Sequence, residues 1–272
     1  MRVVLVLLAI VALTGCGGAD QAEEATTVVA AFYPLAWAAE QIGGAEAHVV
    51  NLTPPGAEPH DIELSPRDVE AIRDADLVVY VGSGFQSAVE DAVAQRDGPS
   101  LDVSGGDRDP HVWLDPVRFA TIAEQIGDAL GHPDAGRGLA RSLRGLDSEY
   151  TIGLEHCARG TLVTTHAAFG HLAARYGLTQ VSLAGRSPEA EPGPRELESL
   201  VDEVRASGAT TVLTEPLASS RLAETVAREA GAKVAVLDPI EGLTKEQLAD
   251  GEDYLSVMRR NLATLKEALG CG

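Results

Sequence analysis

The stretch TLVTTHAAFGHLAARYGLTQVSL, residues 161–183, decides the fold because its residue pattern changes period twice. A short β-branched run is followed by a helical pattern over 167–176 and then by a second β-rich run, TQVSL. Strands that alternate with helices of about ten or more residues indicate a parallel sheet covered by helices. This part of the chain is therefore predicted to form two parallel strands of a sheet with a helix between them.

The same alternation runs through most of the chain. Strands are predicted at 26–32, 47–52, 76–82, 100–104, 161–166, 179–183, 210–215 and 232–238. Helices are predicted at 34–43, 66–74, 116–130, 134–157, 167–176, 194–207, 219–230 and 251–269, with Ser65 as an N-cap before Pro66. Two halves of this kind, joined by a helical segment, predict two α/β lobes with parallel sheets.

The first residues, MRVVLVLLAIVALTGC, have the pattern of an export signal. Arg2 supplies a minimal positive region, and the apolar run over 3–13 is too short to span a bilayer as a helix. LTGC resembles the lipobox of bacterial lipoproteins, which predicts lipidation of Cys16 on the outer face of the cell membrane. An ordinary signal peptide, cut after a small residue, is the alternative.

Composition narrows the choice of partners. The chain has 272 residues, 45% of them hydrophobic, and a formal net charge of −20 at pH 7. Such an acidic chain is a poor partner for nucleic acid or for an anionic membrane surface, and it is compatible with binding cations. After Cys16, two cysteines remain, Cys157 and Cys271, and outside the cytosol such a pair favours a disulfide bond. A thiolate metal site is the weaker alternative, because neither cysteine has another cysteine nearby.

Four polar residues are predicted to lie where a strand ends or a proline-rich loop turns: His60, His111, His166 and Asp238. His111 lies in DPHVWLDP (109–116), where prolines limit the freedom of the loop. Ligands of α/β proteins gather beyond the carboxyl ends of the strands. Three imidazoles and a carboxylate suit a divalent transition metal in a cleft between the lobes. Taken singly, each of these histidines also fits a capped or solvated loop residue.

Six motifs resemble the successive signatures of the metal-binding solute-binding proteins of zinc and manganese ABC transporters. They are AAFYPLAWAAEQIGG (30–44), PGAEPHDIELSPRD (55–68), DPHVWLDP (109–116), THAAFGHLAARYGL (165–178), SPEAEPGPRELESLVDEVR (187–205) and AKVAVLDPI (232–240). The resemblance runs in order from about residue 26 to residue 265. It implies two α/β lobes joined by one long rigid helix, with the metal held between the lobes.

The resemblance also implies function. It assigns the metal ligands to His60, His111, His166 and Asp238, and the partner to a membrane permease with its cytoplasmic ATPase. Histidine rather than glutamate at 166 favours Zn²⁺, with Mn²⁺ or iron as the alternative. Many zinc members carry a histidine-rich loop before DPH, whereas this chain has only SGGDRDP (104–110).

The expected organisation is a signal peptide at 1–15, a lipidated tether at 16–25, an N-terminal lobe at 26–133, a connecting helix at 134–158 and a C-terminal lobe at 159–272. Glu215 is predicted to support a ligand imidazole, and Trp113 and Phe169 to pack near the metal. His171 is interpreted as a packing residue and Glu58 as an exposed loop carboxylate.

The expected molecule is a monomeric carrier with a small lobe movement, not an enzyme. A zinc hydrolase is the main rival, since three histidines with an open position can activate water. No HExxH motif is present in the sequence, and Asp238 is expected to close the metal's ligand set. A surface adhesin is a third possibility.

Overall fold

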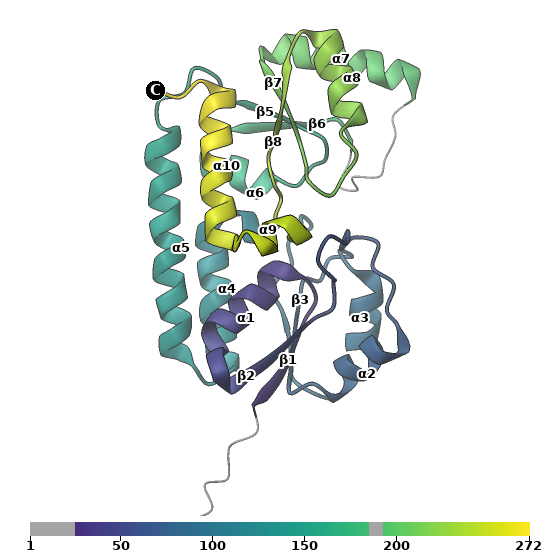
Figure 1. The fold of residues 1–272 in the computed structure, drawn as a ribbon, viewed down its shortest axis with the longest axis vertical. Helices are drawn as coiled ribbons and strands as arrows, with labels where there is room; N and C mark the ends of the chain where they lie inside the picture. The colour runs from purple at the N-terminus through teal and green to yellow at the C-terminus, as the bar shows by residue number, and fades with distance from the viewer. Residues whose placement is uncertain (1–24, 185–192) are drawn as a thin grey trace, which may run out of the picture.

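The computed structural model describes residues 25–184 and 193–272, which form two parallel sheets flanked by helices (Figure 1). The strands are β1 (Thr26–Ala30), β2 (Ala47–Asn51), β3 (Leu77–Tyr80), β4 (Ser100–Asp102), β5 (Thr161–Thr164), β6 (Thr179–Ser182), β7 (Thr211–Thr214) and β8 (Lys233–Val236). The α-helices are α1 (Tyr33–Gly43), α2 (Pro66–Asp74), α3 (Ser87–Val93), α4 (Pro116–Ala129), α5 (Pro133–Leu154), α6 (Gly170–Arg175), α7 (Pro194–Ser207), α8 (Arg221–Ala230), α9 (Lys245–Ala249) and α10 (Tyr254–Leu269). Short 3-10 turns η1 and η2 cover Gly44–Glu46 and Val112–Leu114.

The two sheets share one topology. The first has the order β2-β1-β3-β4 and the second the order β6-β5-β7-β8, and every paired strand is parallel. The first strand of each half therefore lies inside its sheet, and the chain crosses to either side of it. This arrangement confirms the predicted fold class of two α/β lobes, here called the first and second lobe after their sheets. It also brings the ends of β5 and β7 side by side.

Local signals in the sequence set most element boundaries. Ser65 caps α2 in a reciprocal capping box with Asp68, and Pro66 occupies the first helical position. Asp115 caps α4 through the backbone N–H groups of Val117 and Arg118. Two short helices, α3 and α9, were not predicted, because runs of seven and five residues carry little periodicity.

A pair of antiparallel helices, α4 and α5, runs along one side of the molecule, and α5 extends to the second lobe (Figure 1). The two helices approach closely at Gly127 and Gly136, where a Cβ on Gly127 would lie 2.8 Å from the Cα of Gly136. The last helix, α10, returns beside α5, and the Tyr150 hydroxyl donates a 2.6 Å hydrogen bond to the Met258 carbonyl. The long helix thus contacts elements on both sides of the molecule.

The main hydrophobic core continues from the first lobe into the second. It joins Val29 and Phe119 of the first lobe with Leu172, Leu237 and Tyr254 from the later part of the chain. A smaller core lies between β5, β7, α7 and α8. Because apolar side chains are shared across the lobe boundary, large rigid-body opening would expose core surface.

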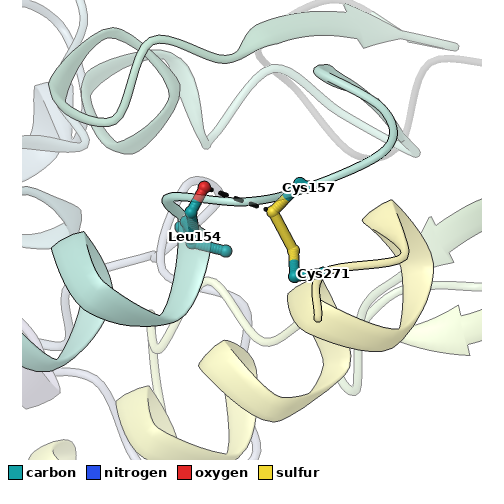
Figure 2. The surroundings of a disulfide bond; sticks show 3 residues. All are labelled: Leu154, Cys157 and Cys271. Atoms are coloured by element: carbon teal, nitrogen blue, oxygen red, sulfur yellow. Dashed lines mark hydrogen bonds between the residues drawn. A yellow bond between two sulfur atoms is a disulfide. The ribbon is translucent and has the colours of Figure 1, made fainter.

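The predicted disulfide bond is present between Cys157 and Cys271 (Figure 2). The two residues also pair as an isolated antiparallel bridge, and Sγ of Cys157 lies 3.2 Å from the carbonyl oxygen of Leu154, at the end of α5. The bond therefore fastens the end of α10 to the end of α5. No helix within the described ranges is long and apolar enough to cross a membrane. Cys16, the predicted lipidation site, lies outside those ranges.

Candidate metal site

Three histidines converge from loops that follow strands. His60 lies between β2 and α2, His111 directly precedes η2, and His166 lies two residues after β5. Their imidazole nitrogens and one carboxylate oxygen of Glu241 all lie within 4.8 Å of one another. The first two histidines come from the first lobe and the third from the second, so the group lies between the two sheets.

Glu241 is the centre of this group. Its Oε1 lies 3.3 Å from Nε2 of His60, 3.2 Å from Nε2 of His111 and 3.4 Å from Nε2 of His166. Glu241, His111 and His166 are buried, while the side chain of His60 is 12% exposed. Three imidazoles and one carboxylate form a donor set that suits tetrahedral Zn²⁺.

Asp238 does not join the group, which corrects the predicted ligand set. Its Oδ1 accepts a 2.8 Å hydrogen bond from the backbone N–H of Ile240, and its Oδ2 accepts one of 2.7 Å from Gln247. Arg260 lies 3.4 Å from the same Oδ2. The Asp238 side chain therefore stabilises the conformation of the loop after β8. The carboxylate of the group comes from Glu241, three residues further on.

A carboxylate orients the imidazole of His111. Nδ1 of His111 lies 2.7 Å from Oδ1 of Asp109, and the same oxygen accepts the backbone N–H of His111. A proton held on Nδ1 leaves the lone pair of Nε2 free to bind a metal. Nε2 of His111 and Nε2 of His166 are buried, and both face Oε1 of Glu241, at 3.2 and 3.4 Å. A buried group of nitrogen and oxygen atoms of this kind is costly unless protons or a metal ion bind to it.

Glu215 contacts His166, because the two residues follow neighbouring strands of the second sheet. His166 follows β5, Glu215 follows β7, and the two strands are neighbours. Oε2 of Glu215 lies 2.6 Å from Nδ1 of His166, and its Oε1 accepts a hydrogen bond from the Thr165 hydroxyl. The contact is the one predicted from the sequence for Glu215: it places a carboxylate at ion-pair distance from the His166 ring, whereas Asp109 accepts a hydrogen bond from Nδ1 of His111.

The charged groups of the site shift one another's pKa values. Burial by itself raises the pKa of Glu241, but hydrogen bonds from His111, His166 and His60 outweigh burial and lower that pKa well below its usual value. Burial lowers the pKa of His166, but the carboxylates of Glu215 and Glu241 outweigh it and raise that pKa to about 10. The same balance, with Asp109 in place of Glu215, raises the pKa of His111. When no metal is bound, the imidazole of His166 therefore carries a proton at neutral pH.

Aromatic rings enclose the histidines. The ring centroid of Trp113 lies 5.2 Å from that of His111, and Phe85 packs edge-on against His60 at 4.6 Å. Phe169 is fully buried and precedes α6. Trp113 was predicted to pack there, and Phe85 was not, because it lies in a loop without a recognisable motif. The rings of Trp113 and Phe85 limit the access of water to the metal-binding atoms.

Glu58 lies beside the site without joining the four residues. Its Oε1 accepts the backbone N–H of His60 at 3.2 Å. Burial, followed by the nearby charge of Glu241, raises the pKa of Glu58 to about 8. Glu58 is therefore half-buried and mostly protonated at neutral pH, in contrast to the exposed loop carboxylate predicted from the sequence.

The protein-family model described as zinc-uptake complex component A, periplasmic, matches residues 28–268. The chain belongs to this family. The zinc-binding protein AdcA of Streptococcus pyogenes is 35% identical over 90% of the chain, but the match covers 56% of AdcA itself. The chain thus spans little more than half the length of that relative. The high-affinity zinc uptake system protein ZnuA of Bacillus subtilis is 33% identical, and the match covers 93% of this chain and 90% of ZnuA.

Solved structures with a similar fold support the assignment to this family. The Zn(II)-bound ZnuA-like domain of AdcA from Streptococcus pneumoniae superposes with a TM-score of 0.77 at 35% identity, covering 90% of this chain and 99% of that domain. The laminin-binding protein of Streptococcus agalactiae, described as having adhesin and metal transporting activity, gives a TM-score of 0.79 at 32% identity and covers the same shares. The two-lobed fold is therefore that of metal-binding solute-binding proteins.

Proposed function

We propose that this protein captures Zn²⁺ outside the cytoplasm and delivers it to an ABC permease for import. The observation that carries the proposal is the ring of three Nε2 atoms, from His60, His111 and His166, around Oε1 of Glu241. Each atom is a zinc donor by type, and the group is small enough for one ion. The relatives named for zinc binding and zinc uptake support the same assignment.

The donor set favours zinc over manganese. Manganese prefers oxygen ligands, whereas imidazole nitrogen suits zinc, and at a given nitrogen-rich site zinc also binds more tightly than Mn²⁺ or Fe²⁺ in the usual order of affinities. Three of the four donors here are imidazoles. A manganese or iron carrier of the same fold is the runner-up, and a metal competition experiment separates the two.

The arrangement supports carriage rather than hydrolysis. A catalytic zinc site holds three protein ligands and keeps a fourth position for water. Here Glu241 offers a fourth donor from a fully buried position, and His111 and His166 are equally buried. An ion bound by all four would have no exchangeable water to activate.

The anchor and the partners complete the proposal. A relative from Streptococcus pneumoniae is named a zinc-binding lipoprotein, which supports lipidation of Cys16 here and a tether over 16–25. The protein would then stand on the outer face of the cell membrane as a monomer, with its lobes at 26–133 and 159–272 and the connecting helix at 134–158. Its partner is a permease driven by a cytoplasmic ATPase, in keeping with a family of uptake-complex components.

Competitive calorimetric titration of the metal-stripped protein (residues 26–272) with Zn²⁺ and Mn²⁺ tests the proposal. We expect one zinc per chain, bound much more tightly than manganese, and loss of that binding in His60→Ala and His166→Ala. Tighter manganese binding would overturn the zinc assignment and leave the carrier function intact. No stoichiometric binding of either metal would overturn both.

A further inference from the structure

Helix α6 of the second lobe contacts the loop that carries His111 in the first lobe. Nε2 of His171, on α6, donates a 3.0 Å hydrogen bond to the carbonyl oxygen of Asp109 and lies 3.8 Å from its Oδ2. The other carboxylate oxygen of Asp109, Oδ1, lies 2.7 Å from Nδ1 of His111. A continuous line of contacts therefore runs from α6, through Asp109, to His111.

The approach of α6 is close enough to constrain the carboxylate of Asp109. A Cβ on Gly170, at the start of α6, would lie 2.7 Å from Oδ2 of Asp109. Real Cβ atoms do not approach oxygen so closely, so a side chain here would turn the carboxylate. Because Oδ1 of the same group holds His111, turning the carboxylate would also move the imidazole.

His171 is largely enclosed at this boundary. Its side chain is 12% exposed, and Oδ2 of Asp107 lies 3.9 Å from its Nε2, with Asp107 itself paired to Arg118 at 3.0 Å. An apolar side chain at 171 would fill the volume and leave the Asp109 carbonyl without its donor from α6. The hydrogen bond, rather than the packing, is therefore what a histidine adds at this position.

We propose that His171 is a positioning residue for the metal: it holds Asp109, and through Asp109 it sets the direction of Nε2 of His111. The proposal rests on the zinc function proposed above. It means that His111 is correctly aimed only when the second lobe is in place against the first. A ligand from the first lobe is thus aligned by a residue of the second.

The test compares His171→Phe with His171→Gln, Gly170→Ala and the exposed control His48→Phe. Zinc affinity is measured by competition with a chelator, the absorption bands of the Co²⁺-loaded protein report the geometry of the ligands, and thermal unfolding of the metal-free protein reports stability. We expect His171→Phe and Gly170→Ala to weaken zinc binding roughly tenfold, as partners of metal ligands do, and to alter the cobalt bands. Gln can donate from its amide to the Asp109 carbonyl, so His171→Gln should remain within about threefold of the parent protein.

Unchanged zinc affinity and cobalt bands in His171→Phe would overturn the proposal. Equal losses of zinc affinity in His171→Phe and His171→Gln, in step with their losses of thermal stability, would also overturn it. The histidine would then be purely structural. If the parent protein binds no zinc, the proposed function itself fails. If the parent binds zinc and His171→Phe binds it equally well, only the positioning role fails.

Discussion

The indole Nε1 of Trp113 donates a 2.7 Å hydrogen bond to the carbonyl oxygen of Pro239, across 126 positions of sequence. Trp113 follows His111 by two residues, and Pro239 precedes Glu241 by two. The hydroxyl of Tyr254 donates to the carbonyl oxygen of Trp113 and adds a second tie from α10. The loop of a histidine ligand and the loop of the carboxylate are therefore fastened together by hydrogen bonds within the protein.

Removing that hydrogen bond should loosen the site. In Trp113→Phe the buried carbonyl of Pro239 loses its donor, which costs about 1–3 kcal/mol of unfolding free energy. We expect faster zinc release as well, because Glu241 is no longer held against His111. Urea unfolding and stopped-flow chelation measure the two effects.

Trp37→Phe is the matched control. Nε1 of Trp37 is buried and has no hydrogen-bond partner among the described residues, so the same substitution there breaks no hydrogen bond. Equal zinc release rates in the two variants would contradict the role given to Trp113.

Glu241 and Asp238 should respond differently to neutralisation. Glu241→Ala removes a metal donor and should weaken zinc binding by more than the 10–100-fold that is typical of residues behind the ligands. Asp238→Asn keeps an acceptor for the N–H of Ile240 and should change zinc affinity less than about tenfold, while lowering stability by about 1–2 kcal/mol. Chelator competition and urea unfolding of both variants check this. A larger affinity loss in Asp238→Asn than in Glu241→Ala would restore the ligand set predicted from the sequence.

Zinc binding should release protons. The pKa of His166 is raised to about 10, so its imidazole carries a proton at neutral pH when no metal is bound, and the pKa of His111 is raised as well. A metal must displace the proton of His166, so apparent zinc affinity should rise with pH up to about 10, about tenfold per unit for each proton released. Calorimetry in buffers of different ionisation enthalpy counts the protons.

Glu215→Gln tests the source of one of those protons. The uncharged amide no longer raises the pKa of His166 as the carboxylate does, so fewer protons should be released at pH 7. An unchanged proton count in this variant would show that His166 is not the group that titrates.

The disulfide should stabilise the fold without affecting the site. It closes a loop with a sequence separation of 114, for which the chain-entropy model gives about 4–5 kcal/mol. Cys157→Ser with Cys271→Ser should therefore lower the unfolding temperature and leave zinc affinity unchanged, because the bond lies at the end of α10 remote from α9 (Figure 1). A weaker zinc complex would mean that the bond also sets the position of the lobes. Titration and calorimetric scanning of the double variant give both quantities.

Periodicity predicted the sheets well because each strand is a short β-branched run with a helix behind it. All eight predicted strands are found in the described residues, and the long helix begins at Pro133, one residue before the predicted start. Helix α9 was beyond such reasoning, since five residues make barely more than one turn and its N-cap, Thr244, follows a loop that contains Gly242.

The histidines of the site could be predicted because they end strands or lie in proline-braced loops. The carboxylate could not, because Asp238 and Glu241 lie in one loop and both are buried. What separates them is the donors around Asp238, chiefly Gln247 of the unpredicted helix α9 and the N–H of Ile240, whose φ of 55° turns the chain. That turn presents Glu241 to the histidines, and a sequence pattern does not encode it. The sequence offered one signal, the acidic residue Glu241 directly after LDPI (237–240).

The most direct test of the central claim is anomalous diffraction at the zinc absorption edge from crystals of the zinc-loaded protein. A single zinc site predicts one strong peak about 2.0–2.2 Å from Nε2 of His60, His111 and His166 and from a carboxylate oxygen of Glu241. A peak bound by Asp238, a peak elsewhere on the protein, or the absence of any peak at full zinc loading would contradict it.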